Sequence, residues 1–525
     1  MTAAPGISSS APVHDVVVIG GGINGCGIAR ELSGRGASVF LCEKGDLAAS
    51  TSSSSTKLIH GGLRYLEHGA FHLVREALAE RETLWRMAPH LISPLRFVLP
   101  HEPALRPAWQ LRAGLFLYDH LGGRRLLPPS SRIDLRGTAI GDALRPGRFR
   151  QGFEYSDCRV DDARLVVLNA RDACDRGATI RTRTQAMRLH ADDQGWLVET
   201  LHLDTGVREI VKARVVVNAA GPWVLDLLRR ANDAARPRHS RLRLVQGTHI
   251  VVPRLYGHDR CYVFQNPDRR IVFAIPYEED FTLIGTTDRD FHGDAAEVRP
   301  HPEDVDYLCT AVNRYLAAPI GRADVVWSYA GVRPLVDDGQ GSAQSATREY
   351  QLELEQFDGR AILSVFGGKV TTYRRLALHA VRKLEPMLPG LRRTAGAWRS
   401  DTPLPGGDFP VRDLPRLTAQ LSRAYEWLAP QICRRLCRSY GTRAWSILGD
   451  ARSTEDLGED FGAGLYMAEI RHLVEQEWAR TAEDIAWRRS KLGLRLSRQQ
   501  LEVIDQRLAG LEPAGLEPAG GEARR

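Results

Sequence analysis

The chain has 525 residues, of which 43% are hydrophobic and 26% charged, an ordinary composition for a globular protein with about three domains. It contains no apolar run near the ~18 residues needed to cross a bilayer, and residues 1–12 lack the basic start and apolar core of a secretory signal. The net charge of +7 is compatible with anionic substrates, anionic lipid or nucleic acid, and selects none of them.

The eight cysteines are scattered along the chain without any C-x-x-C pair. Cys433 and Cys437 have the i, i+4 spacing of a helix face, but no further histidine or cysteine completes a metal site beside them. We therefore expect buried free thiols in a reducing cytoplasm, and no bound metal.

A strand, a glycine turn, a helix and a second strand follow one another near the N-terminus. The apolar run 15–19 is bounded by turn residues, as a buried parallel strand should be, and the stretch from Gly20 to Gly25 then fits G-x-G-x-x-G. Residues 23–32 have helical spacing, and the second strand, 38–43, ends in a carboxylate. This order predicts a dinucleotide-binding domain rather than a plain glycine-rich turn.

Each part of this unit has a physical role in binding a dinucleotide. Gly20 permits the tight turn, Gly22 lets a pyrophosphate approach the backbone, and Gly25 lets the helix and strand pack closely. The helix N-terminus favours phosphate, while Glu43 can accept hydrogen bonds from a ribose and argues against NADP. FAD and NAD both remain open. The expected cofactor contacts are Gly20, Gly22, Ile23, Asn24, Gly25, Glu43 and Lys44.

A run of hydroxyl side chains at 51–56 precedes Lys57 and the sequence Leu-Ile-His-Gly-Gly-Leu-Arg-Tyr at 58–65. A flexible linker would also be rich in serine, but the residues that follow do not have the composition of a linker. A hydroxyl-rich loop with a lysine and backbone N–H groups suits a pyrophosphate and the edge of a flavin. We expect cofactor contacts from Thr51, Ser52, Ser55, Lys57 and His60.

Two later segments, 214–223 and 363–369, repeat the pattern of a buried strand followed by a tight turn, and the second opens a helix. The dinucleotide-binding domain is therefore predicted to be discontinuous. Further cofactor contacts are expected from Ala220, Gly221, Gly367, Gly368, Lys369, Val370 and Thr371.

The intervening segments 242–287 and 324–354 have β-rich patterns. Apolar runs flank a turn at 266–268, which predicts a hairpin and, with its neighbours, a second domain built on an antiparallel sheet. Proline and glycine at 403–407 mark a boundary, and the pattern beyond it is helical. Thr481 to Asp484 resembles a capping box.

We predict the following division of the chain. A flexible leader covers 1–13, and a cofactor domain is formed by 14–100 with parts of 150–240 and 356–395. A substrate domain, which includes a segment for membrane contact, is formed by 101–149 with 241–355. A helical domain covers 408–508, and a disordered tail rich in proline and glycine covers 509–525.

The three cofactor segments together resemble flavoproteins of the amino-acid-oxidase-like, glutathione-reductase-type superfamily. Seven motifs in order then resemble the FAD-dependent, respiratory glycerol-3-phosphate dehydrogenases of the aerobic bacterial type, over roughly residues 14–508; they lie at 20–25, 51–68, 152–158, 247–253, 284–288, 331–335 and 366–374. The resemblance implies an α/β fold with a discontinuous Rossmann-like FAD-binding domain, an antiparallel-sheet substrate domain and an α-helical C-terminal domain.

The same resemblance implies that sn-glycerol 3-phosphate is oxidised to dihydroxyacetone phosphate and that FAD passes the electrons to a membrane quinone. Cys26 stands where the family often has alanine, and Ala220 where threonine is common before Gly221. No histidine or cysteine position compels a covalent link, so we expect FAD to be bound non-covalently.

A phosphate dianion needs cations at fixed positions, and Arg64, Arg333 and Lys369 lie in the family motifs. For Arg333 a solvated surface charge is the alternative, weakened by its apolar neighbours. Tyr65 and Thr286 are expected to contact substrate as well.

Oxidation of a secondary alcohol also needs a base for the hydroxyl proton. His249 is the first choice, within a strand of family-matching residues, and a core histidine with satisfied hydrogen bonds is its alternative. His60 is the second candidate. Arg333 and Lys369 complete the predicted catalytic set.

A quinone acceptor implies contact with a membrane surface, at the inner face of the cytoplasmic membrane. Residues 105–112 and 115–118 are apolar and aromatic, with Arg112, Arg124 and Arg125 close by. This composition suits an interfacial helix on anionic lipid, and equally an ordinary core helix with basic flanks.

Three other functions remain to be compared with this one. An oxidase would use the same substrate but pass electrons to oxygen, and an NAD-linked dehydrogenase would be colourless. A flavin-containing nucleic-acid-binding protein is suggested only by the basic charge, with no arginine–aromatic pattern to support it, so we expect no nucleic acid. A homodimer is an expected assembly, although no sequence feature specifies the oligomeric state.

Overall fold

The computed structural model describes residues 13–102, 106–123, 126–193, 195–231, 241–268, 270–337, 349–357, 360–391 and 398–511. The predicted leader up to residue 12, the tail from 512, and Arg124 and Arg125 lie outside the described residues. The side chain of Arg64, predicted to bind phosphate, also lies outside them.

The first sheet runs in the order β17–β18–β10–β1–β2–β7, and its neighbouring strands from β18 to β7 are parallel. A hairpin of β8 and β9 joins it through β9, which pairs with the first half of β10. Three separated parts of the chain thus form one sheet, as predicted. The strands are β1 (Val13–Ile19), β2 (Val39–Cys42), β7 (Thr179–Arg181), β8 (Thr184–Asp192), β9 (Gly195–His202), β10 (Arg208–Asn218), β17 (Gln351–Phe357) and β18 (Arg360–Phe366).

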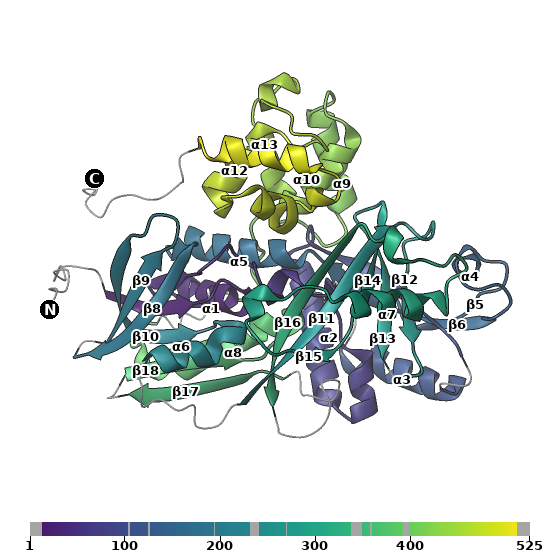
Figure 1. Cartoon of the computed structure of the whole chain (residues 1–525), viewed down its shortest axis with the longest axis horizontal. Helices are drawn as coiled ribbons and strands as arrows, with labels where there is room; N and C mark the ends of the chain where they lie inside the picture. The colour runs from purple at the N-terminus through teal and green to yellow at the C-terminus, as the bar shows by residue number, and fades with distance from the viewer. Residues whose placement is uncertain are drawn as a thin grey trace.

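Both faces of this sheet are covered, which explains why residues 16–19 of β1 form a continuous, buried apolar run (Figure 1). Val16 and Val18 pack into the core shared with helices α1 (Ile23–Gly34), α5 (Asp162–Asp175) and α8 (Tyr373–Leu384). Val17 and Ile19, on the opposite face, pack toward the β8–β9 hairpin and α6 (Val224–Ala231).

The second sheet runs in the order β15–β11–β14–β13–β12–β4–β6–β3, with β16 beside β11 and β5 beside β6. It is antiparallel except between β12 and β4, and β12 and β13 form the predicted hairpin. The strands are β3 (Leu58–Ile59), β4 (Ile92–Pro100), β5 (Ser131–Asp134), β6 (Gln151–Val160), β11 (Arg241–Pro253), β12 (Cys261–Gln265), β13 (Ile271–Tyr277), β14 (Phe281–Gly285), β15 (Arg289–Asp290) and β16 (Trp327–Asp337).

Three strands lie in a different sheet from the one that the predicted boundaries give them. Strand β17 falls largely within 241–355, predicted for the substrate domain, but joins the first sheet, and β3, within 14–100, joins the second. Strand β4 also falls within 14–100, the first segment predicted for the cofactor domain, but it belongs to the second sheet. It pairs with β6 along its whole length, and Phe97 of β4 stacks on Tyr155 of β6 with ring centroids 5.1 Å apart. An apolar strand pattern does not indicate which sheet a strand joins, because that choice depends on distant partners.

Helices α2 (Phe71–Met87), α3 (Ala108–Leu121), α4 (Ala139–Asp142) and α7 (Pro302–Asn313) flank the second sheet. Helix α3 covers the segment predicted either to meet a membrane or to lie in the core. Leu115 and Tyr118 are buried, whereas Trp109, Phe116 and Leu117 are 73%, 60% and 41% exposed. One face of the helix therefore packs and another presents apolar side chains to solvent. Among the described residues no helix combines the length and apolarity needed to cross a membrane.

The C-terminal domain is helical, as predicted, and sits on one side of the two sheets (Figure 1). Its helices are α9 (Leu414–Ala424), α10 (Pro430–Tyr440), α11 (Ala444–Leu448), α12 (Met467–Glu477), a π-helix (Asp484–Arg489) and α13 (Arg498–Leu508). The predicted cap is present: the Asp484 N–H donates to Thr481 Oγ1 at 3.2 Å, and the Asp484 carboxylate accepts from the Thr481 N–H at 3.0 Å.

Buried ion pairs fasten this domain to the rest of the molecule. Asp46, which follows β2, accepts hydrogen bonds from Arg488 at 2.6 Å and from Arg489 at 2.7 and 2.8 Å. Arg164 of α5 pairs with Glu477 of α12 in the same junction. All five side chains are at least nine-tenths buried. Removing one partner would leave an uncompensated charge away from water.

We predict that Asp46→Asn destabilises the docking of the C-terminal domain by about 3–5 kcal/mol, because two buried guanidinium groups lose their carboxylate. Urea unfolding followed by tryptophan fluorescence measures the effect. Asp401→Asn is the matched control, since Asp401 pairs with Arg399 at the exposed surface and its loss should scarcely change the midpoint. Equal midpoints for the two variants would contradict the prediction.

Candidate active site

The glycine turn after β1 has the close contacts that its sequence requires. Gly20 has φ +117°, and a Cβ there would lie 2.4 Å from the carbonyl oxygen of Ala219, the residue after β10. A Cβ on Gly25 would lie 1.9 Å from the Gly20 oxygen, so only glycine lets α1 approach the turn. A Cβ on Gly22 would meet one atom, Ser52 Oγ at 3.1 Å, so the space above this residue is otherwise open. The turn therefore forms a cradle at a helix N-terminus, suited to a pyrophosphate.

The carboxylate of Glu43 lies beside this cradle, at the end of β2. It accepts hydrogen bonds from the Gly21 N–H at 2.6 Å and the Gly45 N–H at 2.8 Å. Burial raises the pKa of Glu43, and these two backbone hydrogen bonds oppose the shift. Lys44 extends instead over the Trp223 ring, with its ammonium 3.4 Å from the ring centroid. Glu43 thus holds the turn and retains lone pairs for a ribose.

The hydroxyl run that begins with the 3-10 turn Thr51–Ser53 joins several elements. Ser52 Oγ accepts from the Ile23 N–H at 3.0 Å, at the start of α1, and Thr51 Oγ1 donates to the Val332 carbonyl at 2.6 Å. Ser55 Oγ donates to Asp162 at 2.6 Å. The loop is therefore fixed between the first sheet, α5 and the second sheet.

Lys57 has a different role from the predicted one. Its ammonium donates to the Asp162 carboxylate at 2.8 Å and to the Ser53 carbonyl at 2.8 Å, and the side chain is buried. It does not line the adjacent cavity. Lys57 supports the loop from behind and is not placed to bind a pyrophosphate.

The turns after β10 and β18 complete the carboxyl edge of the first sheet. Gly221 follows Ala220 with φ +56°, and begins a 3-10 turn, Gly221–Trp223. Asn24 Nδ2 donates to the Gly367 carbonyl at 3.1 Å, and a Cβ on Gly368 would lie 2.8 Å from that amide. Asn24 Oδ1 is buried without a protein partner in the described structure. The three predicted cofactor segments therefore meet at one edge.

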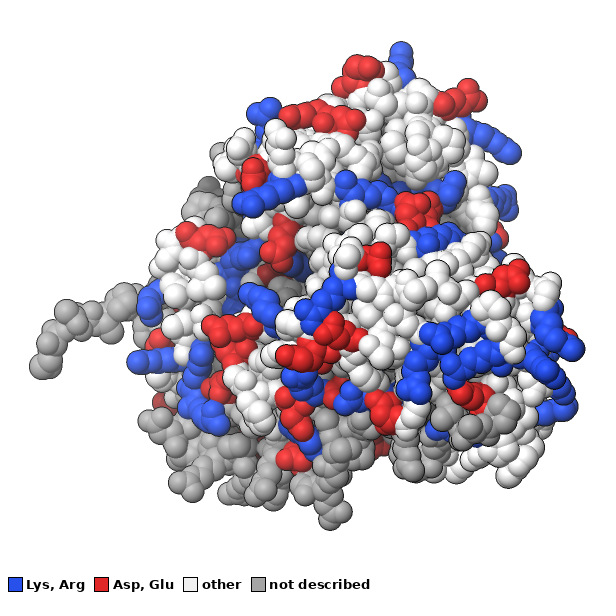
Figure 2. Space-filling model, turned by 45° about the vertical axis from the view of Figure 1, so that its right-hand side comes forward, with Lys and Arg blue, Asp and Glu red and all other residues white. Residues whose placement is uncertain are grey.

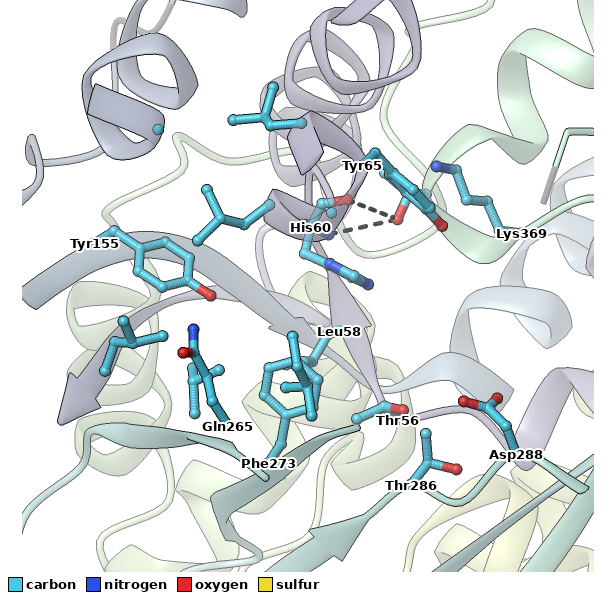
Figure 3. A pocket seen from close by; sticks show the side chains of 18 of the residues that line it. Thr56, Leu58, His60, Tyr65, Tyr155, Gln265, Phe273, Thr286, Asp288 and Lys369 are labelled. Carbon is cyan, nitrogen blue, oxygen red and sulfur yellow. Dashed lines mark hydrogen bonds between the residues drawn. The ribbon is translucent and has the colours of Figure 1, made fainter. Parts of the chain in front are cut away.

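A cavity of about 520 Å³ opens next to this edge, between the loop 51–66, the second sheet and α3 (Figure 3). Predicted site residues on its wall are Thr51, Ser55, His60, Tyr65, Thr286, Arg333, Gly368, Lys369, Val370 and Thr371. Apolar side chains of α2 and α3, including Phe71, Leu111 and Leu117, line it as well. Arg106 and Gln110, at the start of the α3 region, line it too, so a polar, cationic end and a mostly apolar mouth share one space.

The cationic end is formed by Arg333 and Lys369. Arg333 lies in β16, pairs with Asp288 at 2.5 Å and donates to Thr286 Oγ1 at 3.0 Å. The ammonium of Lys369 lies 4.8 Å from the centroid of the Tyr65 ring. The contacts with Asp288 and Thr286 hold the Arg333 guanidinium in one orientation. Arg333 and Lys369 both face the same cavity.

The two candidate bases differ in position. His60 lines the cavity, its ring extends into the open space, and its backbone is hydrogen-bonded to Thr371 (Figure 3). His249 is completely buried behind Thr56, whose Oγ1 lies 3.0 Å from His249 Nε2. Burial, then the positive charges of Arg333 and Lys57, hold the pKa of His249 well below its ordinary value, so the ring is neutral.

Two neighbouring residues, Gly285 and Tyr329, enclose the His249 ring. A Cβ on Gly285 would lie 2.1 Å from His249 Cδ2, so glycine at this position makes room for the ring. Tyr329 stacks on the other side, with centroids 4.8 Å apart. The predicted first-choice base therefore does not touch the cavity, and reaches it only through the Thr56 hydroxyl.

A buried hydrogen-bond network joins helix α3 to the wall of the active-site cavity. Tyr118 Oη accepts from the Gly61 N–H at 2.8 Å and donates to Asp157 at 2.6 Å. Asp157 in turn pairs with Arg81 of α2. The peptide next to His60 is thereby tied to a helix whose other face is exposed and apolar.

Sequence reasoning missed several wall residues. Thr56 lies within the hydroxyl run, so its place could have been inferred from that motif. Gln265 is the polar end of an otherwise apolar strand, which is a weak indication. Tyr155 comes from a distant strand, and no local pattern places it here.

Comparison with protein families agrees with this division of the chain. Residues 15–374 match the family described as "FAD dependent oxidoreductase". Residues 399–512 match the family described as "C-terminal domain of alpha-glycerophosphate oxidase".

Individual relatives match over almost the whole length. A glycerol-3-phosphate dehydrogenase of Pseudomonas aeruginosa is 51% identical over 96% of each chain. A D-erythritol 1-phosphate dehydrogenase of Brucella abortus is 48% identical over 92% of this chain and 95% of its own. The solved structure of a glycerol-3-phosphate dehydrogenase from Bacillus halodurans, complexed with FAD, has a TM-score of 0.72 and 27% identity, and covers 95% of this chain and 94% of that one.

The residues present fit FAD. The cradle at Gly22 suits the pyrophosphate, the buried Asn24 Oδ1 offers an acceptor that has no protein partner in the described structure, and the wall from Gly368 to Thr371 bounds the cavity. The chain therefore belongs to the family of FAD-dependent oxidoreductases that includes the glycerol-3-phosphate dehydrogenases, and it is an enzyme whose cofactor is FAD.

Proposed function

We propose that this protein oxidises sn-glycerol 3-phosphate to dihydroxyacetone phosphate and passes the electrons to a membrane quinone, as input to respiration during glycerol catabolism. The observation that carries the proposal is a single cavity with two cations at one end and an exposed apolar rim at the other. The cations suit a phosphate ester, and the rim suits a lipid-soluble acceptor.

In this proposal the substrate phosphate lies against Arg333 and Lys369. Arg333 offers a planar fork already oriented by Asp288 and Thr286, while Lys369 supplies a mobile point charge. The Arg64 backbone lies in the neighbouring 3-10 helix, Leu63–His68, and its guanidinium is a further proposed phosphate contact.

When bound, FAD accepts the hydride from the substrate carbon. The hydroxyl proton needs an acceptor on the cavity wall, and His60 is the imidazole that lines it. His249 stays neutral and hydrogen-bonded to Thr56, so it orients that hydroxyl and offers a second route for the proton. We therefore propose that His60 accepts the hydroxyl proton directly and that His249 acts indirectly, through the Thr56 hydroxyl.

The apolar rim supports a membrane acceptor. Trp109 and Phe116 of α3 and Phe71 of α2 are exposed, an unusual position for large aromatic side chains, and the cavity opens among these helices. We propose that this rim lies in the inner face of the cytoplasmic membrane, with the protein attached peripherally. An oxidase that delivers electrons to oxygen would not need the rim.

An anaerobic spectrum of the purified holoenzyme tests the function. Glycerol 3-phosphate should bleach the flavin band, and a soluble quinone should restore it faster than oxygen does. Erythritol 1-phosphate, the substrate class named by one relative, serves as the comparison and should bleach the band more slowly. Failure of both phosphates would refute the reaction, whereas faster reoxidation by oxygen with peroxide release would favour the oxidase.

Lys369→Met should raise the KM for glycerol 3-phosphate about 10- to 100-fold with a smaller effect on kcat, because a charge-assisted contact of about 1.5–3 kcal/mol is lost. Steady-state kinetics with a quinone analogue measures both constants. Lys383→Met, at the exposed end of α8, is the matched control and should leave KM unchanged. An unchanged KM in the Lys369 variant would remove this residue from the phosphate site.

The paired change Trp109→Ser and Phe116→Ser should weaken binding to phosphatidylglycerol vesicles at least tenfold, because each exposed aromatic ring contributes about 1.5–3 kcal/mol when buried in lipid. Vesicle co-sedimentation measures binding. The control is Leu203→Ser with Val326→Ser, two exposed apolar side chains away from the rim. Identical sedimentation of both double variants would place the membrane contact elsewhere.

A further inference from the structure

A second cavity, of about 460 Å³, lies at the seam between the C-terminal domain and the two sheets. Its walls come from the end of β6, the turn between β13 and β14, α10, and the segment that follows the π-helix. Basic and acidic side chains gather along the boundary beneath the C-terminal domain (Figure 2). The cavity is separate from the active-site cavity, with which it shares no lining residue.

Most charges on its wall have a partner of opposite sign. Lys57 pairs with Asp162 at 2.8 Å, Arg435 with Glu469 at 2.6 Å, Lys491 with Asp161 at 3.3 Å and Arg495 with Asp280 at 2.6 Å. The remaining basic groups on the wall are Arg159 and Arg438.

These two guanidinium groups come from opposite sides of the seam. Arg159, at the end of β6, donates through Nε to Ser93 Oγ at 2.8 Å, and no carboxylate of the described residues lies within 4.0 Å of it. Arg438, in α10, approaches Glu278 and Glu279 only to 3.9 Å. Burial, then the positive charge of Arg438, lowers the pKa of Arg159. The two cations repel each other across the cavity, and the carboxylates of Glu278 and Glu279, on the same wall, offset part of that repulsion.

Uncharged polar groups on the same wall also lack partners in the described structure. Tyr277 Oη and both ring nitrogens of His90 are buried without a hydrogen bond, although each side chain is more than nine-tenths buried. Arg435 Nε is unpartnered as well. Buried polar groups of this kind normally have hydrogen-bond partners, so several such groups on one wall favour a polar ligand there.

We propose that the seam binds a small, multiply charged anion bearing carboxylate or phosphate groups, held between Arg159 and Arg438 with Tyr277 as a neutral donor. An anion at this point would make charge-assisted contacts with both guanidinium groups, shorter than the 3.9 Å that separates Arg438 from Glu278 and Glu279. Because one arginine belongs to the body and the other to the C-terminal domain, its binding also strengthens the attachment of that domain.

One short loop separates the seam cavity from the active-site cavity. Lys57 lines the seam cavity, while Thr56, the preceding residue, lines the active-site cavity and contacts His249. The inference does not depend on which polyol phosphate is the substrate.

Isothermal titration of the FAD-loaded enzyme with citrate and, separately, with inorganic phosphate tests the site. We expect saturable binding of at least one anion, and a loss of at least tenfold in Arg159→Gln and in Arg438→Gln. Arg434→Gln is the matched control, because Arg434 lies in the same helix but not on the cavity wall. Tyr277→Phe should weaken binding about fivefold and keeps the charges in place.

Inorganic phosphate can bind at the seam or in the active-site cavity, so a second titration distinguishes the two sites. Citrate or phosphate bound at the seam should still titrate in Lys369→Met, in which the active-site cavity has lost a cation. Binding that persists unchanged in Arg159→Gln, Arg438→Gln and Tyr277→Phe means an adventitious ion only and overturns the proposal. Absence of saturable binding by both anions overturns it too. If an arginine variant fails to fold, Tyr277→Phe decides the outcome.

Discussion

The buried ion pair of Lys57 and Asp162 holds together the part of the molecule on which the site depends. Asp162 begins α5, beneath the first sheet, and also accepts from Ser55, so the C-terminal end of the hydroxyl loop is fixed to this carboxylate through two side chains. From that fixed loop Ser52 reaches α1, and Thr51 reaches β16. A segment without regular strands or long helices thus sets the distance between the cofactor turn and the substrate cavity.

Local constraints made much of the fold predictable from sequence. The turn at Gly20 and Gly25 is dictated by atoms that lie within a few residues or in the adjoining strand, and the hairpin of β12 and β13 by a short turn. Predicted site residues lie on the cavity wall where their motifs are contiguous, as in the stretch from Gly368 to Thr371. Their assignment to FAD followed from resemblance, because the glycine turn itself accepts FAD or NAD.

The sequence did not indicate in which direction a side chain points or which sheet a strand joins. Lys57 and His249 lie in the expected motifs, but one ammonium turns toward Asp162 and one imidazole lies behind Thr56. Strand β4 joins the second sheet through β6, which follows it by some fifty residues. Each of these outcomes depends on partners that are distant in the chain, and periodicity carries no information about them. The seam cavity is another such feature, because its two arginines belong to segments far apart in sequence.

The hydrogen bond from the Gly61 N–H to the Tyr118 hydroxyl connects helix α3 to the peptide beside His60. A Cβ on Gly61 would lie 2.7 Å from the Tyr118 hydroxyl, so helix and peptide are in direct contact with no slack between them. Asp157 and Arg81 anchor the same hydroxyl from beneath. Helix α3 and the peptide beside His60 therefore share one hydrogen-bonded contact that Asp157 holds from the other side. The position of the exposed aromatic face is in this way linked to the position of the wall that carries His60.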